Sequence, residues 1–80
     1  MPLITPEQLA AARAVLGWSR DRLGAVSGTP AHHILRFERF GHVTGGMPLD
    51  AIRRALEASG VEFAEDGGAR LRNKRVKRQR

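Results

Sequence analysis

The sequence predicts a compact all-α domain of four to five short helices, followed by a small C-terminal β-hairpin and a disordered basic tail. Between residues 1 and 60, apolar residues recur at helical spacing in several short segments, and proline, glycine or hydroxyl residues mark their ends. Residues 61–72 contain two short apolar-polar stretches around a glycine-rich turn. Residues 73–80 contain too little apolar side chain to fold. We therefore expect a helical domain at 1–60, a hairpin extension at 61–72 and a disordered tail at 73–80.

The first helix is expected to begin at Pro6, because Thr5 can accept a hydrogen bond from the free amides of the first turn. Gln8 completes a reciprocal capping pair with Thr5. Gly17 can adopt the left-handed conformation that ends a helix. The apolar stripe of this helix is Leu9, Ala12 and Leu16.

The second helix has the same kind of start, with Ser19 as its cap. Trp18 and Leu23 stand at the two positions of a hydrophobic staple, which favours a packing role for the tryptophan. Gly28 ends this helix.

A third helix is predicted directly afterwards, with Thr29 as its cap and Pro30 in its first turn. Since almost no linker separates the second and third helices, they should cross steeply. Ile34 and Phe37 share the apolar face, and Gly41 ends the helix.

A fourth helix should open at Pro48, after a glycine-rich connection, and run to Gly60. Its buried face is expected to be Leu49, Ile52 and Leu56. The hairpin then pairs residues 61–63 with residues 70–72 across a turn at 66–68. Because an isolated two-stranded hairpin is marginal in water, it should pack on the helices or pair with a second chain.

Composition limits the classes of function. The chain has 80 residues, a net charge of +6 and no cysteine, which excludes disulfides and thiol catalysis and fits a reducing compartment, so we expect a cytoplasmic protein. No segment is apolar enough to cross a membrane, and the first residues lack the features of a signal peptide. The acidic residues and serines form no catalytic pair or triad with a positioned base, so the sequence does not suggest an enzyme. We predict neither an enzyme nor a cofactor.

The positive charge is concentrated at the C-terminus. Residues 1–60 contain seven arginines and five acidic residues, whereas residues 69–80 contain seven cations and no acid. The tail can be a solvated extension, or it can follow DNA phosphates and add non-specific affinity, which is the interpretation we favour. Its expected phosphate-contacting residues are Lys74, Arg75, Lys77, Arg78 and Arg80.

Residues 5–63 resemble the Cro/repressor-type (Xre) helix-turn-helix family. The likeness is carried by the stretch 17–19, by the segment 52–63, and by five residues of the second and third helices and the turn between them. These five are Leu23, Gly28, Ile34, Phe37 and Glu38. The resemblance implies a DNA-binding transcriptional regulator, expected to be a repressor and a homodimer on double-stranded DNA. In this family the second helix lies across the DNA backbone and the N-terminal part of the third enters the major groove.

By position, the resemblance assigns DNA contacts to the starts of the second and third helices. The residues so assigned are Ser19, Arg20, Thr29, Ala31, His32, His33 and Arg36. Glu38 is expected to make a structural contact that orients the third helix. For the two adjacent histidines, plain solvent exposure is the alternative.

Four residues depart from the family pattern. Arg20 stands where glutamine is usual, and it could bind backbone phosphate in the same way, whereas the other three suggest a second hypothesis. Pro30 removes an amide that could meet a phosphate. Leu35 and Phe40 place apolar side chains where polar or small ones are usual, so they either pack inward or meet a protein. The alternative function is a helix-turn-helix fold that binds a transcription factor as an anti-activator.

We predict no metal site. Adjacent helical residues point about 100° apart, so His32 and His33 cannot easily bind one ion. His42 adds only one further ligand, and no cysteine is present.

Overall fold

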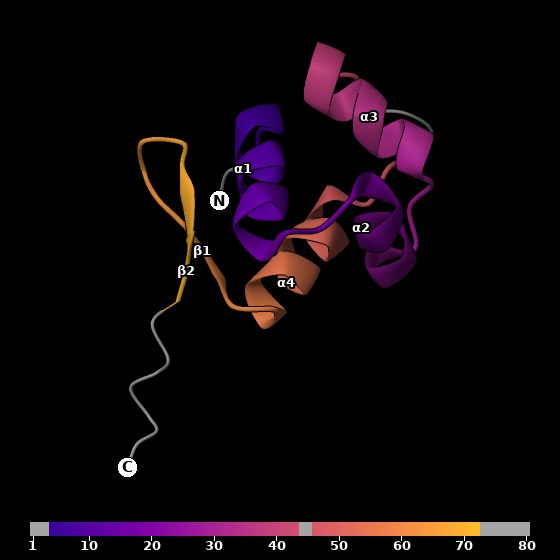
Figure 1. Ribbon diagram of the computed structural model, residues 1–80. Coiled ribbons are helices and arrows are strands. Elements are labelled where there is room, and N and C mark those ends of the chain that lie inside the picture. Colours follow the sequence, from indigo (N-terminus) through magenta and orange to yellow (C-terminus); the bar gives the residue numbers. More distant parts are fainter. Residues whose placement is uncertain (1–3, 44–45, 73–80) are drawn as a thin grey trace.

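The computed structural model describes residues 4–43 and 46–72, which form four helices and a two-stranded antiparallel sheet (Figure 1). The elements are α1 (Pro6–Leu16), α2 (Arg20–Ser27), α3 (Ala31–Phe40), α4 (Leu49–Ala58), β1 (Val61–Phe63) and β2 (Ala69–Leu71). The predicted mostly helical chain with a small hairpin is confirmed. No helix within the described ranges is long and apolar enough to cross a membrane. The predicted disordered tail at 73–80 lies outside the described residues.

The predicted ends of α1 and α2 are confirmed in atomic detail. The Thr5 Oγ1 accepts from the Gln8 amide at 3.1 Å, and the Gln8 Oε1 accepts from the Thr5 amide at 3.0 Å. The Ser19 Oγ accepts from the Arg22 amide at 3.0 Å. Gly17 ends α1 with a φ of 70°, a left-handed conformation that glycine adopts without steric cost.

The prediction that Thr29 caps α3 is wrong. The first hydrogen bond of α3 is accepted by the Pro30 carbonyl, so Pro30 is the cap residue and Thr29 precedes it by one position. Pro30 has no side-chain acceptor to offer, and α3 therefore begins without a side-chain cap. Thr29 is instead 3% exposed, and its Oγ1 has no hydrogen-bond partner in the described part of the chain.

The close approach of the α2–α3 turn to α2 requires two glycines, one inside α2 and one at its end. Gly28 takes a φ of 74° and ends α2. At Gly24 a Cβ atom would lie 2.5 Å from the Thr29 carbonyl oxygen, so only glycine lets the chain pass this close to α2. The carbonyl of Gly24 accepts from the amides of Gly28 and Thr29, which fixes the turn.

One core joins the helices. Its buried apolar residues are Ile4, Leu9, Ala12, Leu23, Ile34, Phe37, Met47, Leu49, Ile52, Leu56 and Val61. The predicted inward residues of α3 and α4 are all in this set. Trp18 is partly buried against it, which confirms its packing role. Pro48 lies just before α4 rather than in its first turn.

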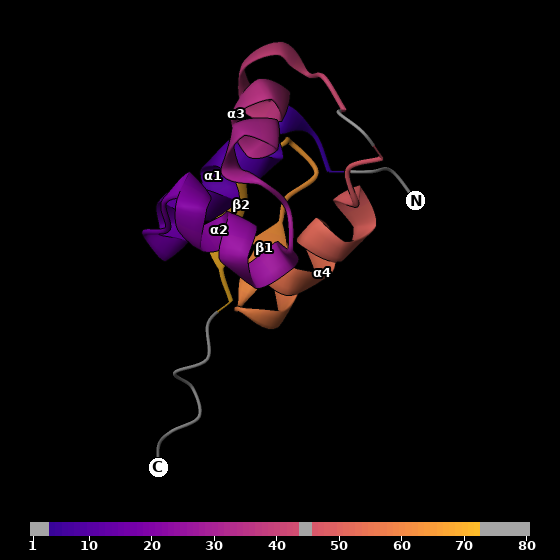
Figure 2. The same ribbon diagram turned by 90° about the vertical axis from the view of Figure 1, so that its right-hand side faces the viewer.

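The hairpin packs on α1, which is one of the two predicted alternatives; the other was pairing with a second chain. β1 and β2 pair in the register Val61 with Leu71 and Phe63 with Ala69. β2 thus starts one residue earlier than predicted. Figure 1 shows the hairpin on one side of α1 and both α2 and α3 on the other. Figure 2 looks onto the side formed by α2 and α3.

Candidate functional site

A nearly buried carboxylate holds α1, α2 and α3 together. The Glu38 side chain is 4% exposed and accepts from the Arg13 Nε at 2.7 Å and Nη2 at 2.9 Å. The Arg20 Nε donates to the same carboxylate at 3.0 Å. The Arg13 Nη1 also donates to the Trp18 carbonyl at 3.0 Å. Charge-assisted bonds of this kind are strong and directional, so the predicted structural role of Glu38 is confirmed.

Arg20 was expected to contact phosphate, but its guanidinium also binds Glu38 within the protein. Its side chain is 38% exposed, so part of it still borders the surface. The resemblance could not supply this contact, because the family position more often holds glutamine. Arg20 both links α2 to α3 and lies at the rim of the groove described next.

An open groove separates the N-terminal ends of α2 and α3. Its lining residues are Arg13, Ser19, Arg20, Asp21, Ala31, His32 and Leu35. Four of the predicted DNA-contacting residues are in this group. Helix N-termini present unpaired amides and a positive dipole end, so the groove favours an anion. Asp21 opposes this tendency, because within the described ranges its carboxylate has no ion-pair partner.

The exposed side of α3 carries a stripe of nitrogen-rich side chains. His32, Arg36 and Arg39 lie at positions i, i+4 and i+7, and all three are exposed. His33 is partly buried, and its ring contacts the His32 ring edge to face at a centroid distance of 4.4 Å. Sequence reasoning missed Arg39, although its i+7 spacing from His32 indicated the same side of the helix. The stripe extends the predicted site toward the C-terminal end of α3.

The arginines divide sharply in how they are used. Of the nine arginines in the described residues, six form an ion pair with an acid. Arg22, Arg36 and Arg39 do not, and all three lie on α2 or α3. Arg22 lies over the Trp18 ring, with 5.3 Å between its Cζ and the ring centroid. The surface of α2 and α3 thus offers guanidinium groups that no acid of the described chain neutralises.

Thr29 does not belong to this surface. It was predicted to approach DNA, but its burial keeps its hydroxyl away from any external ligand. The cap of α3 is Pro30, so Thr29 lies in the connection between α2 and α3, where it is buried. The predicted phosphate-contacting residues Lys74, Arg75, Lys77, Arg78 and Arg80 lie outside the described residues.

Leu35 and Phe40 do not form one apolar surface. Five helical positions place their side chains about 140° apart around α3. Leu35 is partly buried and lines the groove toward α2. Phe40 is 66% exposed, and Val43 beyond it is also exposed. Of the two residues, the more exposed is therefore the one at the end of α3; Val26 on α2 and Leu71 on β2 are further exposed apolar side chains.

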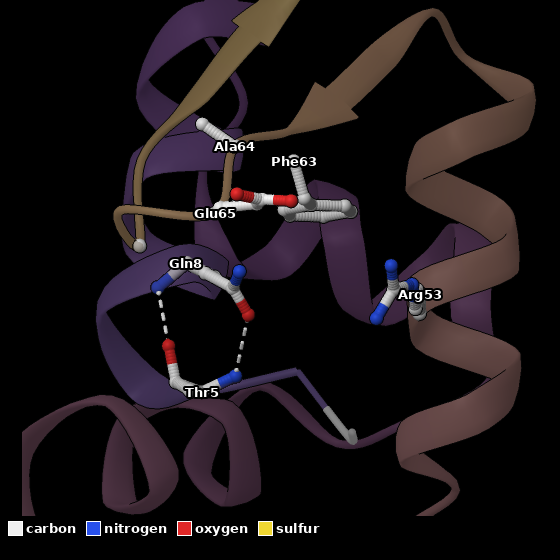
Figure 3. A pocket seen from close by; sticks show the side chains of 7 residues that line it. Thr5, Gln8, Arg53, Phe63, Ala64 and Glu65 are labelled. Atoms are coloured by element: carbon white, nitrogen blue, oxygen red, sulfur yellow. Dashed lines mark hydrogen bonds between the residues drawn. The ribbon is translucent and has the colours of Figure 1, made fainter. Parts of the chain in front are cut away.

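A second hollow lies between the start of α1, α4 and the hairpin turn (Figure 3). It is lined by Thr5, Gln8, Arg53, Phe63, Ala64, Glu65 and Gly67. The capping pair of α1 forms its floor, and the Arg53 Cζ lies 5.2 Å from the centroid of the Phe63 ring. Arg53 also binds Glu57 at 3.0 Å. The contact between Arg53 and Phe63 joins α4 to the hairpin, which gives the hollow a structural explanation.

The described residues contain no group of three or more histidine and acidic side chains that could hold a metal ion. No protein-family model matches the chain, and no curated protein matches it.

Proposed function

We propose that this protein is a sequence-specific DNA-binding transcriptional regulator of the Cro/repressor helix-turn-helix type. The observation that carries the proposal is the set of arginines on α2 and α3 that have no acidic partner among residues 4–43 and 46–72. An arginine that no acid neutralises can donate two parallel hydrogen bonds to guanine or bind a phosphate. The short connection between α2 and α3, which follows the Gly28 cap of α2, supports the same reading.

In the proposed complex, the exposed side of α3 enters the major groove. Arg36 contacts a base edge, while Arg39 and His32 contact bases or phosphates. Ser19 and Ala31 bring the first turns of α2 and α3 toward the DNA backbone, where their free amides meet phosphate. Arg20 contributes the part of its guanidinium that Glu38 does not engage.

Two further elements of the proposal come from the sequence. We expect two copies to bind a repeated half-site, because a two-fold dimer doubles the contacts of one helix. We also expect the basic tail to neutralise phosphates. A chain that ends at Arg72 should then show a shallower dependence of DNA affinity on salt, by nearly one log unit per log of salt for each lost contact.

The proposal is tested by selecting duplexes from a random DNA pool at near-physiological salt with the full-length protein. Enrichment of a defined site, lost in the variant Arg36→Ala and kept in Arg54→Ala, supports it. Arg54 is a suitable control because it is an exposed arginine on α4 that pairs with Asp50. Recovery of an unenriched pool overturns the proposal.

The exposure of Phe40 favours one alternative, a helix-turn-helix fold that binds a transcription factor as an anti-activator. Under this alternative, the selection returns no enriched site. Phe40→Ala then weakens binding to the protein partner, whereas Arg36→Ala leaves the weak non-specific DNA association nearly unchanged.

A further inference from the structure

Two adjacent histidines stand in the first turn of α3. His32 is exposed and lines the groove between the N-terminal ends of α2 and α3, whereas His33 is partly buried beside it. Their rings meet edge to face, with 4.4 Å between the centroids. Neither histidine has an ion pair with an acid in the part of the chain that the structure describes. Because histidine changes its charge between about pH 5 and 8, a group of this kind can make the groove sensitive to pH.

The groove holds little negative charge that could balance a positive imidazole. α1 and α2 are the elements that pack against α3. The titratable and charged groups that these elements and α3 itself place around the His32 side chain are Arg13, Arg20, Asp21, His33 and Arg36. Asp21 is the single acid in this set. The buried Glu38 carboxylate already accepts from Arg13 and Arg20, so it is not available to His32.

A DNA phosphate is the anion that would supply the missing charge. Arg20 uses its Nε on Glu38 and is 38% exposed, so the rest of its guanidinium borders the groove. His32 lines the α3 side, in the N-terminal part of the helix that the proposed complex brings to the DNA. A phosphate between these two side chains accepts from both, and its negative charge favours the protonated imidazole, which donates from both nitrogens. A base edge carries no net charge, so a contact to a base would depend less on pH.

We propose that His32 binds a DNA phosphate in its protonated form, so that each protomer takes up a proton when it binds DNA. The inference rests on the proposed DNA-binding function and adds a pH dependence to it. Since the bound state holds more protons than the free protein, DNA affinity falls as the pH rises through the range in which histidine loses its charge. His33 is not among the residues that line the groove, so we assign the proton to His32.

The test measures the affinity of the full-length protein for the selected duplex by fluorescence anisotropy, at about pH 6 and about pH 8 and at constant ionic strength. The wild-type protein should bind about tenfold more tightly at the lower pH for each protomer, the effect of one opposite charge at short range. His32→Gln keeps a hydrogen-bond donor but cannot become charged, so its affinity should be nearly the same at both pH values. His32→Lys is positive at both and should keep the tighter binding at the higher pH.

His42→Gln is the matched control, because His42 is exposed but lies beyond the end of α3 and outside the groove lining. This variant should keep the pH dependence of the wild type. Thermal unfolding at both pH values should show that the variants remain folded.

The outcomes separate the two proposals. If a duplex is enriched but the wild type binds it equally at both pH values, this inference fails and the DNA-binding function stands. The inference also fails if His32→Gln responds to pH as strongly as the wild type, or if His33→Gln abolishes the response. If no duplex is enriched, the proposed function itself fails.

Discussion

The two sides of the molecule use their arginines in opposite ways. On α4 and the hairpin, Arg53, Arg54, Arg70 and Arg72 each pair with a nearby acid. On α3, the arginines at positions 36 and 39 have no such pair within the described chain. The net charge of the chain is therefore a poor guide to its surface, because pairing decides which cations remain for a ligand. The predictions below test this contrast.

The largest effect is expected from Glu38→Gln, which leaves two arginines without their shared carboxylate. Removing one partner of a buried ion pair typically costs about 3 kcal/mol of unfolding free energy. The matched change on the other side, Glu57→Gln, affects a partly exposed pair with Arg53 and should cost less than about 1 kcal/mol. Urea denaturation of both variants measures the difference. Equal losses would show that the α3 network is no more important than a surface pair.

A smaller loss of stability is expected from Gly24→Ala. Alanine is the better helix former, yet its Cβ would lie 2.5 Å from the Thr29 carbonyl oxygen, and overpacking typically costs about 2 kcal/mol. Gly28→Ala is the control, because a Cβ there meets no atom within 4 Å and only the left-handed conformation opposes it, at about 1 kcal/mol. Thermal unfolding should rank Gly24→Ala below Gly28→Ala. The reverse order would argue against the close approach of α2 to the turn.

Arg36→Ala should weaken specific DNA binding by about 2 kcal/mol and leave the unfolding free energy unchanged, because the side chain is exposed and has no ion pair in the described part of the chain. Fluorescence anisotropy with the selected duplex measures the affinity. The control Arg54→Ala removes an exposed arginine from the opposite side and should bind as the wild type does. If both variants lose the same affinity, the arginines act only through the net charge of the protein. The difference in ion pairing between the two sides would then have no effect on DNA binding.

The smallest effect is expected from Asp21→Asn, and it runs in the opposite direction. Asp21 lines the groove between the starts of α2 and α3, where its charge repels a phosphate. Its removal should tighten DNA binding about threefold at low salt, in keeping with the modest energies of exposed charges. The gain should shrink as salt is added. Asp50→Asn, on α4, provides the comparison and should change DNA affinity little. A loss of affinity in Asp21→Asn would place the phosphate away from this groove.

Much of the fold was predictable because its signals are local. The capping pair of Thr5 and Gln8 depends on neighbouring residues, and so do the glycine ends of α1, α2 and α3. The inward residues of α3 and α4 follow from helical periodicity alone. Each of these features depends on residues only a few positions apart in the sequence, so a local sequence pattern is enough to predict it.

The parts that escaped prediction depend on contacts between elements or on a shift of one residue. Thr29 looked like a cap, but Pro30 occupies that place, and Thr29 is buried in the connection between α2 and α3. The link from Arg20 to Glu38 joins residues 18 positions apart, which no local pattern reveals. Arg39 could have been found from its spacing. The separation of Leu35 from Phe40 could also have been found from helical geometry.

The shared carboxylate of Glu38 has a consequence for the kinetics of recognition. Because Arg13 and Arg20 already bind Glu38 of α3, we expect that no helix reorients when the proposed DNA complex forms. A surface that is rigid before contact loses little conformational entropy on binding. The association rate should then be limited by diffusion and charge attraction, and the backbone of α3 should move by less than about 1 Å between the free and bound forms.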